Sequence, residues 1–191
     1  MENQFANDKE FMLALLAYNG TYLEHASDEL KADKEVIMAA LQSGYSLPYE
    51  HVSDALKTDK DFLLEIVSLD AYCLEFFSEE LKQDEQIVLA AAKNSGDAAL
   101  EFGADKFKTN KNIITEAVKN TWEALLPHNI SNERILSDKE IIMEGMKHSP
   151  DALYYGSDNL KNDRELLLSA LLNKDKINHT NRIDEILDEL F

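Results

Sequence analysis

Apolar residues recur in pairs along this chain, and each pair follows an acidic or amide residue by three positions. A second, mostly apolar pair comes four residues after the first, so one stripe of an α-helix carries all four positions. The pattern returns every 25 to 28 residues, which predicts one amphipathic helix in each unit. The seven units start at Asp8, Asp33, Asp59, Asp84, Asn110, Asp138 and Asp163.

We count positions in a unit from its starting residue, which is position 0. An Asp or Asn at position 0 fits the N-cap of a helix, because its side chain can accept a hydrogen bond from a free backbone N–H. An acid at position +2 of most units lies in the first turn, where the helix dipole favours negative charge. Position +7 is mostly small, which predicts that another helix comes close there. The small residues are Ala40, Ala91, Ala117, Gly145 and Ala170.

The second half of each unit carries its own motif, an apolar residue that usually precedes a lysine, as in Leu30-Lys31 and Leu81-Lys82. A small residue stands three positions before it. An aromatic residue or histidine stands five positions before it, namely His25, His51, Phe76, Phe102 or Tyr155. We predict a short helix and a turn that ends in a Ser-capped helical turn. Gly20, Gly44 and Gly96 are expected to mark the break between the two helices.

A unit of this length cannot bury its apolar stripe alone, but stacked units can bury their stripes against one another. We therefore predict an all-α fold, an α-solenoid of about seven helix–turn–short-helix repeats. We expect right-handed winding, as in common helical repeats, and a single domain over residues 1–191. Residues 181–191 are predicted to form a helix that caps the end of the solenoid. Its apolar face contains Ile183, Ile186, Leu187 and Leu190.

Two stretches show the core of the repeat clearly. Residues 30–40 read LKADKEVIMAA, and residues 81–91 read LKQDEQIVLAA. This pattern resembles the core L-K-x-D-x-E-φ-V-x-x-A of a tandem repeat domain of unknown function found in bacteria and protists. One such domain spans about two of these units, and the resemblance covers most of the chain. It implies a helical repeat fold and no activity, cofactor or site residue.

The charge of the chain is strongly negative. Nineteen basic and 37 acidic residues give a formal net charge of −18, of which residues 1–109 carry −13. Coulomb repulsion disfavours direct binding to nucleic acid or to an anionic membrane, and it favours a basic protein partner. The alternative is that the acidic surface serves only to keep the protein in solution.

The cellular compartment is indicated by what the sequence does not contain. The one cysteine, Cys73, excludes an internal disulfide and suits a reducing compartment. Neither a secretion signal nor an apolar run long enough to span a membrane is visible. We therefore expect a cytoplasmic protein, or one delivered into a host cytoplasm, with Cys73 buried rather than reactive.

The fifth unit departs from the pattern. Trp122, the only tryptophan, opens a stretch through His128 that replaces the expected turn and short-helix start, and three extra residues precede Asp138. One interpretation is a local insertion with Trp122 packed across a kinked junction. The other is an exposed aromatic anchor on an interaction surface, so we keep Trp122 as a candidate for partner contact.

No catalytic, metal-binding or nucleotide-binding motif stands out in the sequence. A His-Glu-x-x-His zinc motif, a calcium loop and a glycine-rich phosphate loop are all missing from it. We expect a protein that is not an enzyme, with no catalytic residue, no metal site and no cofactor.

Two functions stay open, and they differ in the surface that they need. The first is a protein–protein interaction module, which predicts an apolar or aromatic patch and mild salt dependence. The alternative is an acidic inhibitor that mimics nucleic acid, which predicts acids on one face and steep weakening of binding by salt. The acidic candidates for partner contact are Glu29, Asp54, Glu79 and Glu80.

Overall fold

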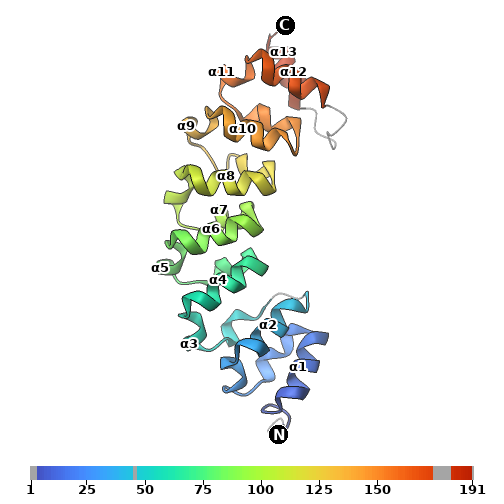
Figure 1. Ribbon diagram of the computed structural model, residues 1–191, viewed down its shortest axis with the longest axis vertical. Helices are drawn as coiled ribbons and strands as arrows, with labels where there is room; N and C mark the ends of the chain where they lie inside the picture. Colours follow the sequence, from blue (N-terminus) through green and yellow to red (C-terminus); the bar gives the residue numbers. More distant parts are fainter. Residues whose placement is uncertain (1–3, 45–46, 174–181, 191) are drawn as a thin grey trace.

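A computed structural model describes residues 4–44, 47–173 and 182–190 of the chain. Its elements are α-helices and 3₁₀-helices, and the described residues contain no strand. The helices stack one above the other in chain order, so the two termini lie at opposite ends of an elongated molecule (Figure 1). The prediction of an all-α repeat fold is therefore confirmed.

Units one to six have three elements each, of which the first is a long α-helix, and unit seven also begins with such a helix. The long helices are α1 (Lys9–Tyr18), α2 (Lys34–Gln42), α4 (Lys60–Leu69), α6 (Glu85–Asn94), α8 (Lys111–Asn120), α10 (Lys139–Met146) and α12 (Arg164–Leu172). The second element, a short helix that is mostly 3₁₀, is η1 (Gly20–His25), η3 (Tyr49–His51), η4 (Ala71–Phe76), α7 (Gly96–Phe102), η6 (Trp122–Leu125) or η7 (Pro150–Tyr155). The third, about one turn long, is η2 (Leu30–Ala32), α3 (Asp54–Lys57), α5 (Glu79–Lys82), η5 (Asp105–Thr109), α9 (Glu133–Leu136) or α11 (Asp158–Lys161).

The seven predicted start residues are the N-caps of the seven long helices. Each has an extended backbone, and its side-chain oxygen accepts a hydrogen bond from a backbone N–H two or three residues later. The predicted serine caps of the one-turn helices are also present, for example Ser53 before α3 and Ser78 before α5. The Asp, Asn and Ser capping residues thus set where these helices begin.

The apolar columns at +3, +4, +7 and +8 form a continuous core. In α4, Phe62, Leu63, Ile66 and Val67 are all buried, and the same four positions are buried in α6 and α8. From α1 to α10, consecutive long helices contact each other along these columns, and η1, η4, α7, η6 and η7 each pack against the long helices on both sides. Each junction therefore completes the core of two units.

Close approach between units explains the small residues at +7 and two of the three glycines. A Cβ added to Gly96 would lie 2.5 Å from the Cα of Ala117, and one added to Gly20 would lie 2.3 Å from the carbonyl oxygen of Ala40. Among the described glycines, only Gly44 has a positive φ, 79°. Gly20 and Gly96 are therefore required because the neighbouring helix leaves no room for a side chain. Gly44 instead provides the left-handed turn that ends α2.

Units two and five depart from the regular form in different ways. In unit two the second element is shortened to η3, and α2 contacts α4 less than the pairs α1–α2, α4–α6, α6–α8 and α8–α10 contact each other. In unit five, η6 begins at Trp122, the same offset as in other units, so the expectation that this start is replaced was wrong. The extra residues instead lengthen the loop between η6 and α9, where Asn129 is buried and donates to Asp97 Oδ1 at 2.8 Å.

A ladder of ion pairs connects the long helices. The lysine at +1 of one unit pairs with the N-cap aspartate of the next unit in five of the six junctions. The pairs are Lys9–Asp33, Lys34–Asp59, Lys60–Asp84, Lys111–Asp138 and Lys139–Asp163, with N–O distances between 2.5 and 2.8 Å. At the remaining junction +1 is Glu85 and the cap is Asn110, whose Nδ2 donates to Glu85 Oε1 at 3.2 Å.

The ladder lowers the pKa of the cap carboxylates. A hydrogen bond from the lysine of the preceding unit is the main cause for Asp33, Asp59, Asp84 and Asp163, and backbone N–H donors add to it. For Asp138 burial opposes the shift, but Lys111 and the backbone donors outweigh it and the pKa is lowered too. A lowered folded-state pKa contributes stability above the unfolded value of 3.8, which is lost as the pH falls through the folded pKa.

The last helix, α13 (Arg182–Leu190), closes the seventh unit. Its residues Ile183 and Ile186 are buried, and it packs against η7, as the second element of a seventh unit would. The buried carboxylate of Asp151 accepts a hydrogen bond from the N–H of Arg182 at 3.2 Å and so caps α13. The predicted capping helix is thus present from residue 182, while Asn181, Phe191 and the side chain of Leu190 lie outside the described residues.

We expect Gly96→Ala to destabilise the fold by about 1–3 kcal/mol, because its methyl group would overlap the backbone of Ala117. Urea unfolding followed by Trp122 fluorescence measures the change. Gly156→Ala is the matched control, since the nearest atom to its added Cβ is the Leu153 carbonyl oxygen at 3.2 Å. Equal midpoints for the two variants would contradict the close approach.

The junction with Glu85 and Asn110, which lacks the lysine–aspartate pair, allows a double-mutant cycle. Glu85→Lys and Asn110→Asp each spoil the present hydrogen bond, but together they recreate the ion pair of the other junctions. We expect a favourable coupling energy of about 0.5–1 kcal/mol in urea unfolding. The control cycle combines Asn110→Asp with Glu101→Lys, an exposed acid on α7, and should be additive. A coupling near zero in the first cycle would show that the ladder contributes nothing.

Candidate functional site

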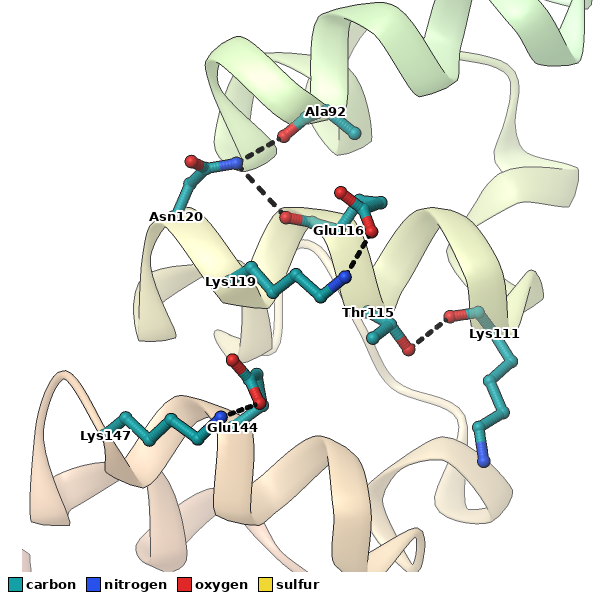
Figure 2. A network of polar contacts seen from close by, with 8 residues as sticks. All are labelled: Ala92, Lys111, Thr115, Glu116, Lys119, Asn120, Glu144 and Lys147. Atoms are coloured by element: carbon teal, nitrogen blue, oxygen red, sulfur yellow. Dashed lines mark hydrogen bonds and ion pairs between the residues drawn. The ribbon is translucent and has the colours of Figure 1, made fainter.

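The long-helix face of the stack is occupied by short-range polar contacts. Figure 2 shows this face at units four to six, where Lys119 pairs with Glu116 on α8 and Lys147 pairs with Glu144 on α10. Asn120 Nδ2 on α8 donates to the carbonyl oxygen of Ala92 on α6 at 2.8 Å. These charged side chains pair with a neighbour on their own helix, so they offer little free charge to a partner.

The second elements of the units form a different surface, and η4 shows its character best. Ala71, Cys73 and Leu74 of this 3₁₀-helix are buried. Tyr72 and Phe76 point away from the core and are 51% and 49% exposed. Two large aromatic side chains thus lie on one short helix with about half of their surface in solvent.

Aromatic contacts extend this surface from unit to unit. Tyr72 of unit three contacts Phe102 of unit four edge-on, with ring centroids 6.2 Å apart. Trp122 of unit five stacks on Tyr155 of unit six, with ring centroids 5.8 Å apart. We call Tyr72, Phe76, Phe102, Trp122 and Tyr155 the aromatic stripe. The sequence had identified the column of Phe76, Phe102 and Tyr155, but the exposure of Phe76 and the contribution of Tyr72 were missed.

Trp122 is half-buried at the first position of η6. Its ring lies nearly parallel to that of Tyr155, with 27° between the planes. The structure therefore places Trp122 in packing across a junction between units, within the stripe rather than as an isolated anchor. Its role in partner contact stays a prediction.

The acidic candidates lie beside the stripe on the one-turn helices. Asp54 opens α3, Glu79 and Glu80 open α5, and Glu29 precedes η2. These one-turn helices follow one long edge of the molecule, on the left in Figure 1. All four side chains are exposed, so the structure brings them to a common edge, with Glu79 and Glu80 closest in sequence to Phe76.

The wider group of exposed acids on the second and third elements of units one to four is called the acidic edge. It consists of Glu24, Asp28, Glu29, Glu50, Asp54, Glu75, Glu79, Glu80, Glu101 and Asp105. Lys57, Lys82 and Lys108 pair with acids three residues earlier on this edge. Lys31 Nζ donates to the carbonyl oxygen of Glu24 at 2.9 Å, and Lys57 makes the equivalent bond to Glu50.

The pKa values near the stripe follow from burial and local hydrogen bonds. Burial, helped by the neighbouring Asp70 carboxylate, raises the pKa of the Cys73 thiol to about 12. Burial also raises the pKa of Tyr49, whose ring packs under Phe76 and Phe77. Hydrogen bonds from its own backbone N–H and from Ser78 lower the pKa of Glu80, which keeps this acid ionised beside the stripe.

Two grooves between long helices follow from the packing of the repeat. One groove lies between α4 and α6 and a second at the same place between α10 and α12, lined among others by Leu64 and Leu89 in the first and Met143 and Met146 in the second. Within the described part of the chain, no group of three or more His, Cys, Asp and Glu side chains could hold a metal ion. No helix among the described residues is long and apolar enough to cross a membrane.

The chain belongs to a known family, the "Domain of unknown function (DUF4116)", which matches residues 8–57, 47–82, 59–102, 84–133 and 138–179. Four of these matches begin at Asp8, Asp59, Asp84 and Asp138, which are N-caps of long helices. The longer matches span about two structural units each, as the resemblance predicted. No curated protein and no solved structure matches the chain.

We expect Cys73 to resist thiol reagents in the folded protein. At pH 8 its raised pKa leaves very little thiolate, and its side chain is buried. Reaction with Ellman's reagent should be at least a hundredfold slower than in urea. The control is Ser68→Cys in a Cys73→Ala chain, an exposed thiol that should react equally fast in both conditions. Fast native labelling of Cys73 would contradict its burial.

Proposed function

We propose that this chain is a non-enzymatic protein-binding module whose binding surface is the aromatic stripe, centred on Tyr72 and Phe76. The partner is a protein with an apolar segment flanked by basic residues. The apolar segment covers the rings, and the basic residues meet Glu75, Glu79, Glu80 and Glu101, which are exposed on η4, α5 and α7. A buried aromatic centre with a polar rim is the usual anatomy of a protein interface.

The observation that carries the proposal is the exposure of Tyr72. Its position, +13, is held by Thr21, Asp97, Glu123 and Asp151 in other units. Those residues are polar, so the repeat itself does not require an aromatic ring at this position. Aromatic residues with half of their surface in water are concentrated in the centres of binding surfaces. Tyr72 therefore serves something other than the stability of its unit.

The inhibitor alternative has no comparable support. The ten acids of the acidic edge and Asp97 of α7 make eleven acids against five lysines on the same segments, which leaves a net charge of −6. Four layers at roughly 10 Å each then carry about one net charge per 7 Å, against one per ~1.7 Å in duplex DNA. We therefore propose the protein-binding module and not the inhibitor that mimics nucleic acid.

An affinity pull-down with three baits tests the stripe. The baits are the wild-type chain, Tyr72→Ala with Phe76→Ala, and Tyr18→Ala, a matched control that removes a 77% exposed ring from α1. We expect a partner captured by the wild type and by the control, and at least a tenfold loss with the double variant. Capture should persist at about 0.5 M salt, because apolar contacts are little screened.

The same assay tests the basic character of the partner. Glu75→Lys beside the rings should weaken capture about fivefold at low salt and less at high salt. Glu65→Lys makes the same charge change in the same unit, on the long-helix face, and should have no effect. A partner captured equally by all baits would overturn the stripe. The inhibitor function would be supported instead if the captured partner were a basic nucleic-acid enzyme whose capture is lost at high salt and does not change with Tyr72→Ala.

A further inference from the structure

The two ends of the stack expose complementary halves of the junction between units. In α1, Met12 and Leu16 at +4 and +8 are buried, whereas Phe11 at +3 is 42% exposed. In α12 the order is reversed, since Leu166 and Ala170 at +3 and +7 are buried and Leu171 at +8 is 40% exposed. Positions +3 and +7 thus face the preceding unit, and +4 and +8 face the following one.

Inside the stack these positions are closed. Position +3 is at most 1% exposed in units two to seven, and position +8 is at most 9% exposed in units one to six. The first unit therefore presents a +3 column that inside the stack is covered by a preceding unit. The seventh unit presents a +8 column, with Leu167 and Leu168 beside it, that inside the stack is covered by a following unit.

The charges at the two ends also match. Inside the stack a cation at +1 pairs with the cap at 0 and often with the acid at +2, as Lys139 does with Asp163 and Glu165 at 2.8 Å each. Arg164 is the +1 cation of unit seven, and the described residues provide no ion pair for it. Asp8 and Glu10, at 0 and +2 of unit one, are likewise exposed and without a cation partner in the described part of the chain.

The backbone before α1 already has the form that a preceding unit would provide. Asp8 N–H donates to Phe5 O at 3.0 Å, as Asp84 does to Leu81 at a junction inside the stack. Ser27 N–H donates to Ala6 O at 2.7 Å, as Ala104 does to Lys82. Phe5 therefore occupies the place of the leucine in the one-turn helix.

We propose that two copies of this chain associate head to tail, with unit one of one copy stacked on α12 of the other as an eighth layer. Phe11 then covers the +8 column at Leu171, and Arg164 pairs with Asp8 and Glu10 of the other copy. The helix α13 packs on η7 and leaves this column of α12 open. Leu15 at +7 is larger than the usual Ala, but Ile66 at the same position of unit three is fully buried.

This contact is heterologous, so further copies can add at either end. A single layer is small compared with the roughly 800 Å² per partner of a stable interface, and each copy carries a charge of −18. Association is therefore expected at high protein concentration and at salt high enough to screen the repulsion between copies.

Sedimentation velocity up to about 1 mM protein, in about 0.5 M salt, tests the proposal with two variants. Phe11→Glu blocks the head and Leu171→Glu blocks the tail. We expect the wild type to self-associate and each variant to lose at least tenfold in association constant. An equimolar mixture should form a 1:1 complex and nothing larger, because one intact head meets one intact tail. Circular dichroism verifies that both variants are folded.

The controls change exposed residues on the same helices outside the junction columns. Tyr18→Glu and Leu172→Glu alter side chains that are 77% and 74% exposed and should leave association unchanged. A charge exchange gives an independent check, since Arg164→Glu and Glu10→Lys should each weaken association and should restore it when mixed. A monomeric wild type, or a mixture of the two blocked variants that does not associate, would overturn the proposal.

Discussion

The whole molecule depends on the burial of one unit against the next. The elements of one unit do not fully cover its own long helix, as Leu171 at +8 of unit seven shows with 40% exposure. The burial of +4 and +8 is completed when the next long helix supplies +3 and +7. This dependence explains the tight contact at Gly96 and Ala117, where any side chain larger than hydrogen would separate two helices whose cores need each other. It also explains why the two ends differ chemically, since each end shows one half of the same junction.

The N-cap carboxylate joins the start of one helix to the neighbouring helix. Asp84, for example, accepts backbone hydrogen bonds from its own first turn and an ion pair from Lys60 of the preceding unit. These side chains are partly exposed, so each pair contributes modestly to stability. Repetition gives the ladder its value, because a fixed distance between the +1 cation and the next cap holds successive helices in register.

The sequence predicted the parts of the fold that depend on residues within one unit. Caps, apolar columns and the Ser-capped last turn all follow from local spacing, and the structure contains them. The ladder was missed because it joins +1 of one unit to position 0 of the next, although Glu85 and Asn110 change together in the one place where the pair differs. Gly20 and Gly96 do lie at the break between two helices, as predicted. The reason for a glycine there was missed, since only a neighbouring helix reveals the lack of space.

The candidate site was harder to predict because exposure depends on how neighbouring units cover a column. At the same position of the repeat, Phe102 is partly buried, whereas Phe76 is 49% exposed. The local sequence does not distinguish the two residues. For Trp122, the choice between packing and anchor depended on Tyr155, 33 residues away.

The two proposed surfaces use different layers of the molecule, so they can operate together. The aromatic stripe lies on the second elements, whereas head-to-tail contact uses columns of the long helices. A head-to-tail pair would carry two stripes on one rod in a fixed relation. A partner with two basic and apolar segments would then bind more tightly to the pair than to the single chain, because the second contact forms within one complex. Such a partner would in turn favour association of the two copies, since it binds the paired form better.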